Sequence, residues 1–236
     1  MLLVLKKKTG DLKYIITSHP KYTKALEHLL DSMYVAKIKP SDIIVILGDC
    51  NTNGKHINEN IKIRPGVHYI PIENNLYEYN FFIGVMKAIE LGVCKRIDSF
   101  FLLHDTCMVG NRFLEKTLEA HQNMSEQIFW NNFKGNFNIG IFKYAAIKEG
   151  YNLFKKMKTM NKHVAILTEH NKHHYSLKRF PVSQKFNPQV KNIRHFFNQD
   201  VYNEKRKRTV AYIRFFDLLK FFLWVPNGNC HPNNIE

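Results

Sequence analysis

Short, mostly apolar runs bounded by turn residues recur through the first half of the chain. Four of them predict strands: Leu12–Thr17, Ile43–Gly48, Val67–Ile72 and Phe100–Leu103. Between the first two runs, apolar residues from Leu26 to Met33 recur at i, i+3, i+4 and i+7, which is one face of a helix. The segment Leu76–Leu91 has the same period and ends at Gly92. This order predicts one α/β domain with a mostly parallel central sheet flanked by helices.

The second half of the chain has a less regular pattern. Residues 127–133 and 137–143 predict two short strands or a hairpin, and residues 145–160 predict a helix. Residues 163–174 predict a strand that runs into a polar loop, and residues 175–203 predict loop with short helices. Residues 209–225 are apolar nearly all round and predict a C-terminal helix. We therefore divide the chain into a domain over residues 1–203 and a basic, aromatic helix and tail over residues 204–236.

The net charge of +15 is the unusual feature of the composition. It predicts attraction to nucleic acid, anionic lipid or a phosphorylated substrate, or it reflects a solvated surface rich in lysine. The basic cluster Lys205–Arg208 precedes an aromatic segment, which fits either a peripheral membrane contact or a segment docked on the core or on another copy of the chain.

Cysteine spacing and the apolar runs bear on the compartment. The four cysteines form no CxxC pair, which favours a reducing compartment over a disulfide framework or a zinc knuckle. The apolar run after Met1 is too short for a signal peptide, and no stretch approaches the ~20 apolar residues that span a bilayer. We expect a cytoplasmic protein, at most peripheral to a membrane.

Polar residues follow three of the predicted strands. Thr17 and Ser18 end the first strand, Asp49 follows the second, and His104 and Asp105 end the run from Phe100. In open α/β sheets the carboxyl ends of the strands meet at the ligand crevice, so these side chains are expected to share one edge. Asp49 there either accepts hydrogen bonds from a nucleotide base or forms an Asx turn, and Asp105 is either a ligand or a turn former.

The segments "YIITSHPKY", "LLDSM" and "IIVILGDCNTN" together resemble the opening of the GT-A glycosyltransferases, especially the inverting enzymes similar to family 2. "ENNLYEYNFFIGVMKAIELG" resembles the next element of that family, with Asn80 and Gly84 at its polar and small positions. "SFFLLHDTC" falls where the family has its Asp-x-Asp motif. The resemblance covers roughly residues 12–142. It implies a GT-A-like fold, a nucleotide-binding half over residues 1–108 and an acceptor half over residues 109–203.

The resemblance also implies roles for single residues. Thr17, Ser18, Asp49, Asn80 and His104 would bind the nucleotide, and Asp105 would hold a divalent cation. In the family the Asp-x-Asp pair holds Mn²⁺ or Mg²⁺ against the diphosphate of a nucleotide sugar. This chain keeps one of the two carboxylates, so His104 or Cys107 would have to replace the other. Lysine or arginine near the site could instead stabilise the leaving diphosphate.

An inverting transfer needs a carboxylate that takes the proton of the acceptor hydroxyl. Glu169, at the end of an apolar run, and Asp200 are the candidates. His170, His173 and His174 either add a metal ligand or are surface histidines. The expected function is therefore transfer of a sugar from a nucleoside diphosphate donor, with UDP and GDP as the nucleotides considered, to a hydroxyl of a glycan or glycoprotein. The alternatives are a basic nucleic-acid-binding protein, for which no motif is found, and a nucleotidyltransferase.

Overall fold

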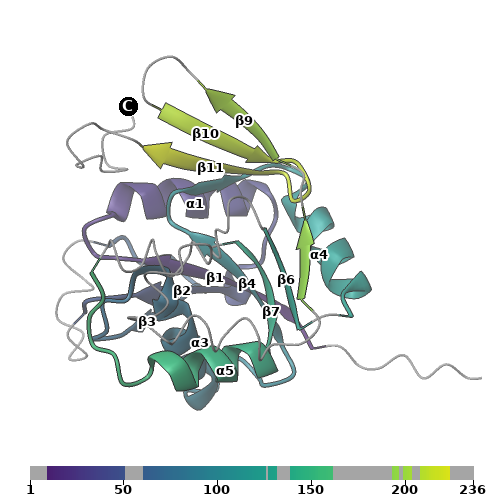
Figure 1. The fold of residues 1–236 in the computed structure, drawn as a ribbon. Helices are drawn as coiled ribbons and strands as arrows, with labels where there is room; N and C mark the ends of the chain where they lie inside the picture. The colour runs from purple at the N-terminus through teal and green to yellow at the C-terminus, as the bar shows by residue number, and fades with distance from the viewer. Residues whose placement is uncertain are drawn as a thin grey trace, which may run out of the picture.

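The computed structural model describes residues 10–50, 61–125, 127–131, 139–161, 193–196, 199–203 and 208–223. Its described strands form a central seven-stranded sheet and a smaller four-stranded sheet (Figure 1). The central sheet has the strand order β3-β2-β1-β4-β7-β6-β8. These strands are β1 (Leu12–Ser18), β2 (Ile43–Leu47), β3 (His68–Pro71), β4 (Ser99–His104), β6 (Ile128–Asn131), β7 (Gly140–Lys143) and β8 (Ile193–Phe196).

Most neighbouring strands of the central sheet are parallel. β3, β2, β1 and β4 pair in parallel, β7 is antiparallel to both of its neighbours, and β8 is parallel to β6. The mostly parallel α/β sheet expected from the sequence is thus confirmed. The four strands predicted in the first half and the two short strands around residues 127–143 all exist, with ends shifted by a few residues at most.

The helices lie on both faces of the sheet because the strand order reverses at β1. Successive strands run from β1 to β2 and β3, and the chain then crosses back to β4 on the other side of β1. Right-handed crossovers in opposite directions place their helices on opposite faces. Accordingly α1 (Thr23–Val35) covers one face, and α3 (Asn80–Glu90) and α5 (Tyr144–Phe154) cover the other (Figure 1).

Two apolar cores result, one on each face of the sheet. Successive residues of β1 alternate between them: Tyr14 and Ile16 pack with α1, whereas Ile15 packs with α3. The helix face predicted from Leu26 to Met33 is buried in the first core. Gly84 of α3 is needed for the second, because a Cβ at this position would overlap the Ile46 side chain of β2. The small residue at 84 thus lets helix and sheet come into close contact.

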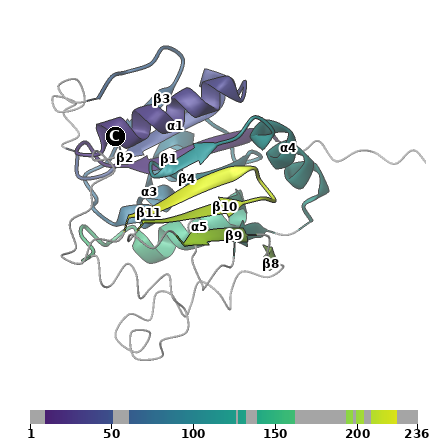
Figure 2. The same ribbon diagram turned by 90° about the horizontal axis from the view of Figure 1, so that it is seen from above.

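The second sheet lies over the α1 face and has the order β5-β11-β10-β9 (Figure 2). Its strands are antiparallel: β5 (Cys107–Val109), β9 (Gln199–Asn203), β10 (Arg208–Ile213) and β11 (Leu218–Leu223). Near it, α4 (Phe113–Asn123) packs Phe113 into the α1-side core. None of the described helices combines the length and the apolar composition that crossing a bilayer requires.

The prediction of a helix over residues 209–225 is wrong, because the described residues of this segment, up to 223, form the β10–β11 hairpin. The chain turns at Arg214–Asp217, where Asp217 has a φ of 54°. From Phe216 onwards, buried residues alternate with half-buried ones, and Phe216, Leu218 and Lys220 face inward. A strand that is apolar on both faces has no helical or strand period in its sequence, so the periodicity could not distinguish the two. β8 and β9 also lie where loop was expected, and β5 lies in a segment for which no helix or strand was predicted.

Two shorter helical segments complete the fold. One turn of 3₁₀ helix over Pro40–Asp42 leads into β2, and another over Tyr77–Tyr79 leads directly into α3. The second of these turns lies between β3 and α3, and its residues Tyr77 and Glu78 lie near the carboxyl ends of β1 and β4.

Candidate functional site

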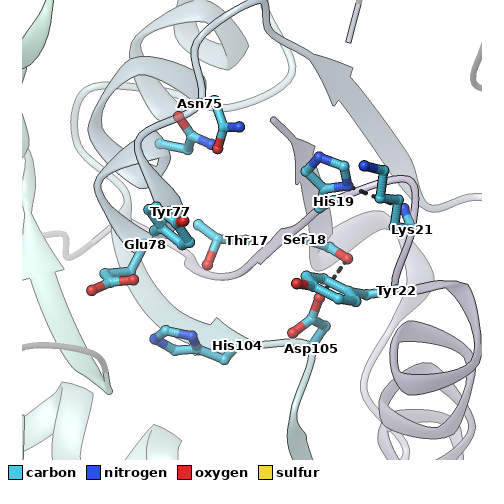
Figure 3. A pocket seen from close by; sticks show the side chains of 11 residues that line it. Thr17, Ser18, His19, Lys21, Tyr22, Asn75, Tyr77, Glu78, His104 and Asp105 are labelled. Carbon is cyan, nitrogen blue, oxygen red and sulfur yellow. Dashed lines mark hydrogen bonds between the residues drawn. The ribbon is translucent and has the colours of Figure 1, made fainter. Parts of the chain in front are cut away.

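The reversal of strand order between β1 and β4 defines where a ligand crevice should lie. In open α/β sheets, the crevice opens at such a switch point, beyond the carboxyl ends of the two strands. β1 and β4 pair with Thr17 opposite His104, so their last residues lie side by side. A cleft of about 230 Å³ opens at this place (Figure 3). Since small-molecule pockets commonly measure about 300–1,000 Å³, a nucleotide sugar would extend beyond it.

Three segments that are far apart in the sequence line this cleft. They are the end of β1 with the turn that follows it, the segment before α3, and the end of β4. The lining residues are Thr17, Ser18, His19, Lys21, Tyr22, Asn75, Tyr77, Glu78, Asn80, His104 and Asp105. In Figure 3, Tyr22 and Asp105 lie on one side, Tyr77 and Glu78 on the other, and His104 lies below them.

A tight packing contact shapes the loop between β2 and α3. The buried Asn80 accepts a hydrogen bond from the Leu76 backbone N–H through Oδ1, at 3.1 Å. A Cβ at Gly48 would overlap the Nδ2 of the same side chain. Glycine at 48 therefore lets the Asn80 amide sit against the end of β2. Asn80 lines the cleft and also holds the loop in place.

Asp105 is held in a buried position by β1. Its Oδ2 accepts a hydrogen bond of 2.8 Å from the Ser18 hydroxyl, and the residue is only 7% exposed. Burial raises the pKa of this carboxyl from 3.8 to about 7, although Ser18, the backbone N–H groups of residues 105 and 106, and the charge of Lys220 oppose the shift. An acidic side chain at this pKa is poised between its neutral and ionised forms near pH 7.

A buried lysine from the second sheet lies close to the end of β4. Lys220 is opposite Cys107 in the β5–β11 pairing and is 5% exposed. Burial, together with this positive charge, holds the pKa of His104 well below its ordinary value, so the imidazole is neutral. Burial also raises the pKa of the Cys107 thiol to about 11, which keeps it protonated. Within the described part of the chain, the His104 Nε2 has no hydrogen-bond partner although it is buried.

His19 links the rim of the cleft to the loop after β2. Its Nδ1 accepts a hydrogen bond from the Lys21 backbone N–H at 3.1 Å, so the neutral ring carries its proton on Nε2. That nitrogen lies 3.2 Å from Asp49 Oδ2. Asp49 has a φ of 58° and a side chain that is 53% exposed, and its backbone N–H is bonded to the Asn74 carbonyl. Asp49 is thus in a turn beside the cleft.

The donors available near Asp105 do not fit a divalent cation. Among the described residues, no three His, Cys, Asp or Glu side chains gather in a way that could hold a metal ion. Asp105 is the carboxylate at this point, with one oxygen already bonded to Ser18. A protonated thiol at Cys107 is a poor ligand for Mn²⁺ or Mg²⁺, which prefer oxygen donors. The buried Lys220 ammonium nearby adds repulsion for a cation.

The structure brings five of the residues selected from the sequence into one cleft. These are Thr17, Ser18, Asn80, His104 and Asp105. Asp49 is adjacent to the cleft, at His19. Asp200 lies on β9 of the second sheet, opposite Tyr212. Glu169 and the histidines at 170, 173 and 174 lie outside the described residues.

Sequence reasoning missed the remaining cleft residues. His19, Lys21 and Tyr22 belong to the turn after β1, and Tyr77 and Glu78 belong to the 3₁₀ turn before α3. A signal was available for the first group, because this polar segment directly follows the predicted strand Leu12–Thr17. Tyr77 also has a φ of 54°, a conformation that non-glycine residues seldom adopt and that tends to occur at functional sites.

Comparisons with known proteins found similar folds at low identity. No protein-family model and no curated protein sequence matches the chain. Among solved structures, 4-diphosphocytidyl-2C-methyl-D-erythritol synthase matches 69% of this chain and 98% of its own, at 12% identity and a TM-score of 0.44. TarS 1-349 of S. aureus in complex with UDP matches 79% of this chain and 57% of its own, at 8% identity and a TM-score of 0.44.

The glycosyltransferase GlyE of Streptococcus pneumoniae TIGR4 matches 81% of this chain and 46% of its own, at 11% identity and a TM-score of 0.43. The chain therefore spans about half the length of each of these last two structures. The TM-scores of these three structures are all below 0.5, so the similarity does not assign a function.

Proposed function

We propose that this protein is a glycosyltransferase that transfers a sugar from a nucleoside diphosphate sugar to a hydroxyl group. The observation that carries the proposal is the convergence of Thr17, Ser18, Asn80, His104 and Asp105 on one cleft at the β1–β4 switch point. Four of these residues were selected because they follow predicted strands, and the resemblance to a nucleotide-sugar site then added Asn80. Their meeting at the ligand edge supports that reading.

The proposed donor lies with its nucleotide across the carboxyl ends of β1 and β4. Asp49, with its half-exposed carboxylate at the rim, is the proposed acceptor for N–H groups of the base. The cleft offers aromatic faces at Tyr22 and Tyr77 and polar groups at Thr17 and Asn80. A pocket that combines aromatic faces with a few fixed polar groups suits a nucleoside.

The proposed reaction is a direct displacement. The acceptor oxygen forms a bond to the anomeric carbon, the bond from that carbon to the diphosphate breaks, and the nucleoside diphosphate leaves with the electron pair. The acceptor hydroxyl gives its proton to a carboxylate, for which Glu169 and Asp200 remain the proposed groups. The acceptor is proposed to be a hydroxyl of a glycan or glycoprotein. No step is assigned to a metal ion.

A screen of nucleotide sugars tests this function. The purified protein is incubated with UDP- and GDP-linked sugars, with and without Mn²⁺, and release of the nucleoside diphosphate is measured. We expect slow hydrolysis of one donor class, and thermal stabilisation by the corresponding nucleoside diphosphate, because a ligand of the native state raises its stability. Stabilisation by oligonucleotides alone, with a steep dependence on salt, would instead indicate a nucleic-acid-binding protein.

A further inference from the structure

The groups around Asp105 raise the question of what neutralises the diphosphate of the donor. A leaving diphosphate needs positive charge that is already in place when its own negative charge develops. The donors at the end of β4 do not suit a divalent ion, since Asp105 is bonded to Ser18 and, among the described residues, no three His, Cys, Asp or Glu side chains gather to hold a metal. The positive charge for the diphosphate would then have to come from cationic side chains of the protein itself.

Two lysines lie where such a charge would act. Lys220 is buried on β11, opposite Cys107, which lies two residues after Asp105 in the chain. Lys21 is an exposed residue that lines the cleft itself, in the turn after β1. Figure 3 shows the Lys21 and His19 side chains next to each other, on the opposite side of the cleft from Glu78.

The two lysines differ in what they can do. Lys21 has a flexible side chain at an open rim, so its ammonium can contact an incoming phosphate. Lys220 is held by the β5–β11 pairing and is nearly closed to solvent, so it acts as a fixed charge that is screened little by salt. A metal ion ligated by Asp105 would add a second positive charge close to the Lys220 ammonium.

We propose that the diphosphate of the donor is bound by the protein's own cations, with Lys21 contacting the phosphates and Lys220 supplying a fixed positive charge beside Asp105, in place of a divalent metal ion. This inference rests on the proposed function and specifies how its donor is held. It assigns β11, a strand of the second sheet, a direct electrostatic part in a site built on the first.

Calorimetric titration tests the proposal on the full chain, with UDP and GDP as probes and the unphosphorylated nucleosides for comparison. Each titration is made in EDTA and again in Mn²⁺. We expect the affinity for the bound nucleoside diphosphate in EDTA to be within about threefold of that in Mn²⁺. Lys21→Met should weaken diphosphate binding about fivefold, the scale of one exposed ionic contact, and leave nucleoside binding unchanged. Lys24→Met, at an exposed position of α1 outside the cleft, is the matched control and should bind as the wild type does.

A second variant tests the fixed charge. Lys220→Met keeps the length and packing of the side chain, and it should weaken binding in EDTA while making binding respond to Mn²⁺. If Lys220→Met fails to fold, the comparison of Lys21→Met with its control Lys24→Met still tests the proposal. Diphosphate binding that appears only with Mn²⁺, or that is the same in Lys21→Met and wild type, overturns the inference but leaves the proposed function standing. Absence of binding in both media overturns both.

Discussion

Replacing Asp105 with asparagine should stabilise the protein at alkaline pH and have little effect at acid pH. The carboxyl is 7% exposed, and its pKa is raised from 3.8 to about 7, chiefly by burial. A carboxyl whose pKa is raised on folding favours the folded state in its neutral form. That stability is fully present below pH 3.8 and is lost as the pH rises through about 7. Asparagine is neutral at every pH and its oxygen can still accept from Ser18.

The magnitude follows from the difference between the two pKa values, which corresponds to about 4 kcal/mol when Asp105 is fully ionised in the folded state. Between pH 5 and pH 8, the difference in unfolding free energy between Asp105→Asn and wild type should grow by about 2–3 kcal/mol. Other titrating groups, including His104, are common to both proteins and largely cancel in the comparison.

Equilibrium unfolding in urea at pH 5, 6, 7 and 8 measures this difference. Asp11→Asn is the control, because the Asp11 side chain is 82% exposed and the substitution removes no buried carboxyl group. A difference between Asp105→Asn and wild type that stays constant across this pH range would refute the reasoning. It would mean that Asp105 ionises in the fold as easily as in the unfolded chain.

Three further predictions concern the packing and the site. Gly84→Ala should destabilise the fold by about 1–3 kcal/mol in urea unfolding, despite the better helix propensity of alanine, because the added Cβ would overlap Ile46. Tyr14→Phe should cost about 1 kcal/mol, since it removes a buried 2.7 Å hydrogen bond but leaves Thr117 bonded to a backbone carbonyl. Asp49→Ala should weaken nucleoside diphosphate binding by about 1–3 kcal/mol in calorimetry. Unchanged affinity would show that Asp49 does not contact the nucleotide base.

The first four strands of the central sheet could be predicted from the sequence because they are short apolar runs with clear ends. Ile43 to Leu47 and Phe100 to Leu103 are uniformly apolar, and each is followed by a polar turn. The order of strands and helices then restricts the topology to a few right-handed arrangements. The positions of Thr17 and Asp105 at one edge follow from that topology alone.

The C-terminal hairpin could not be predicted in the same way. Residues 209–223 are apolar on both faces, and such a run suits a buried strand and a buried helix equally well. The pairings of β11 with β10 and β5 define it as a strand, and the pairing with β5 joins residues about a hundred positions apart. For the same reason no sequence pattern could place Lys220 beside Asp105. Its role in the site becomes visible only when the second sheet is assembled.

Half of the cleft was missed because its residues lie in turns. His19, Lys21 and Tyr22 follow β1, and their inward positions depend on the turn conformation rather than on a period. Tyr77 and Glu78 lie in a single 3₁₀ turn, where side-chain direction depends on an uncommon backbone conformation at Tyr77. The strand ends could be located from the sequence, but the directions of the turn side chains could not.

The most direct test of the central claim is to map where a nucleoside diphosphate sits on the chain. The protein is irradiated with 5-azido-UDP or 8-azido-GDP in EDTA, and labelled peptides are located by mass spectrometry. We expect labelling in the segments that line the cleft, residues 17–22, 75–80 and 104–105, and its loss in the presence of excess unlabelled nucleotide. Protectable labelling that maps elsewhere, or none that excess nucleotide removes, would contradict the assignment of this cleft as the donor site.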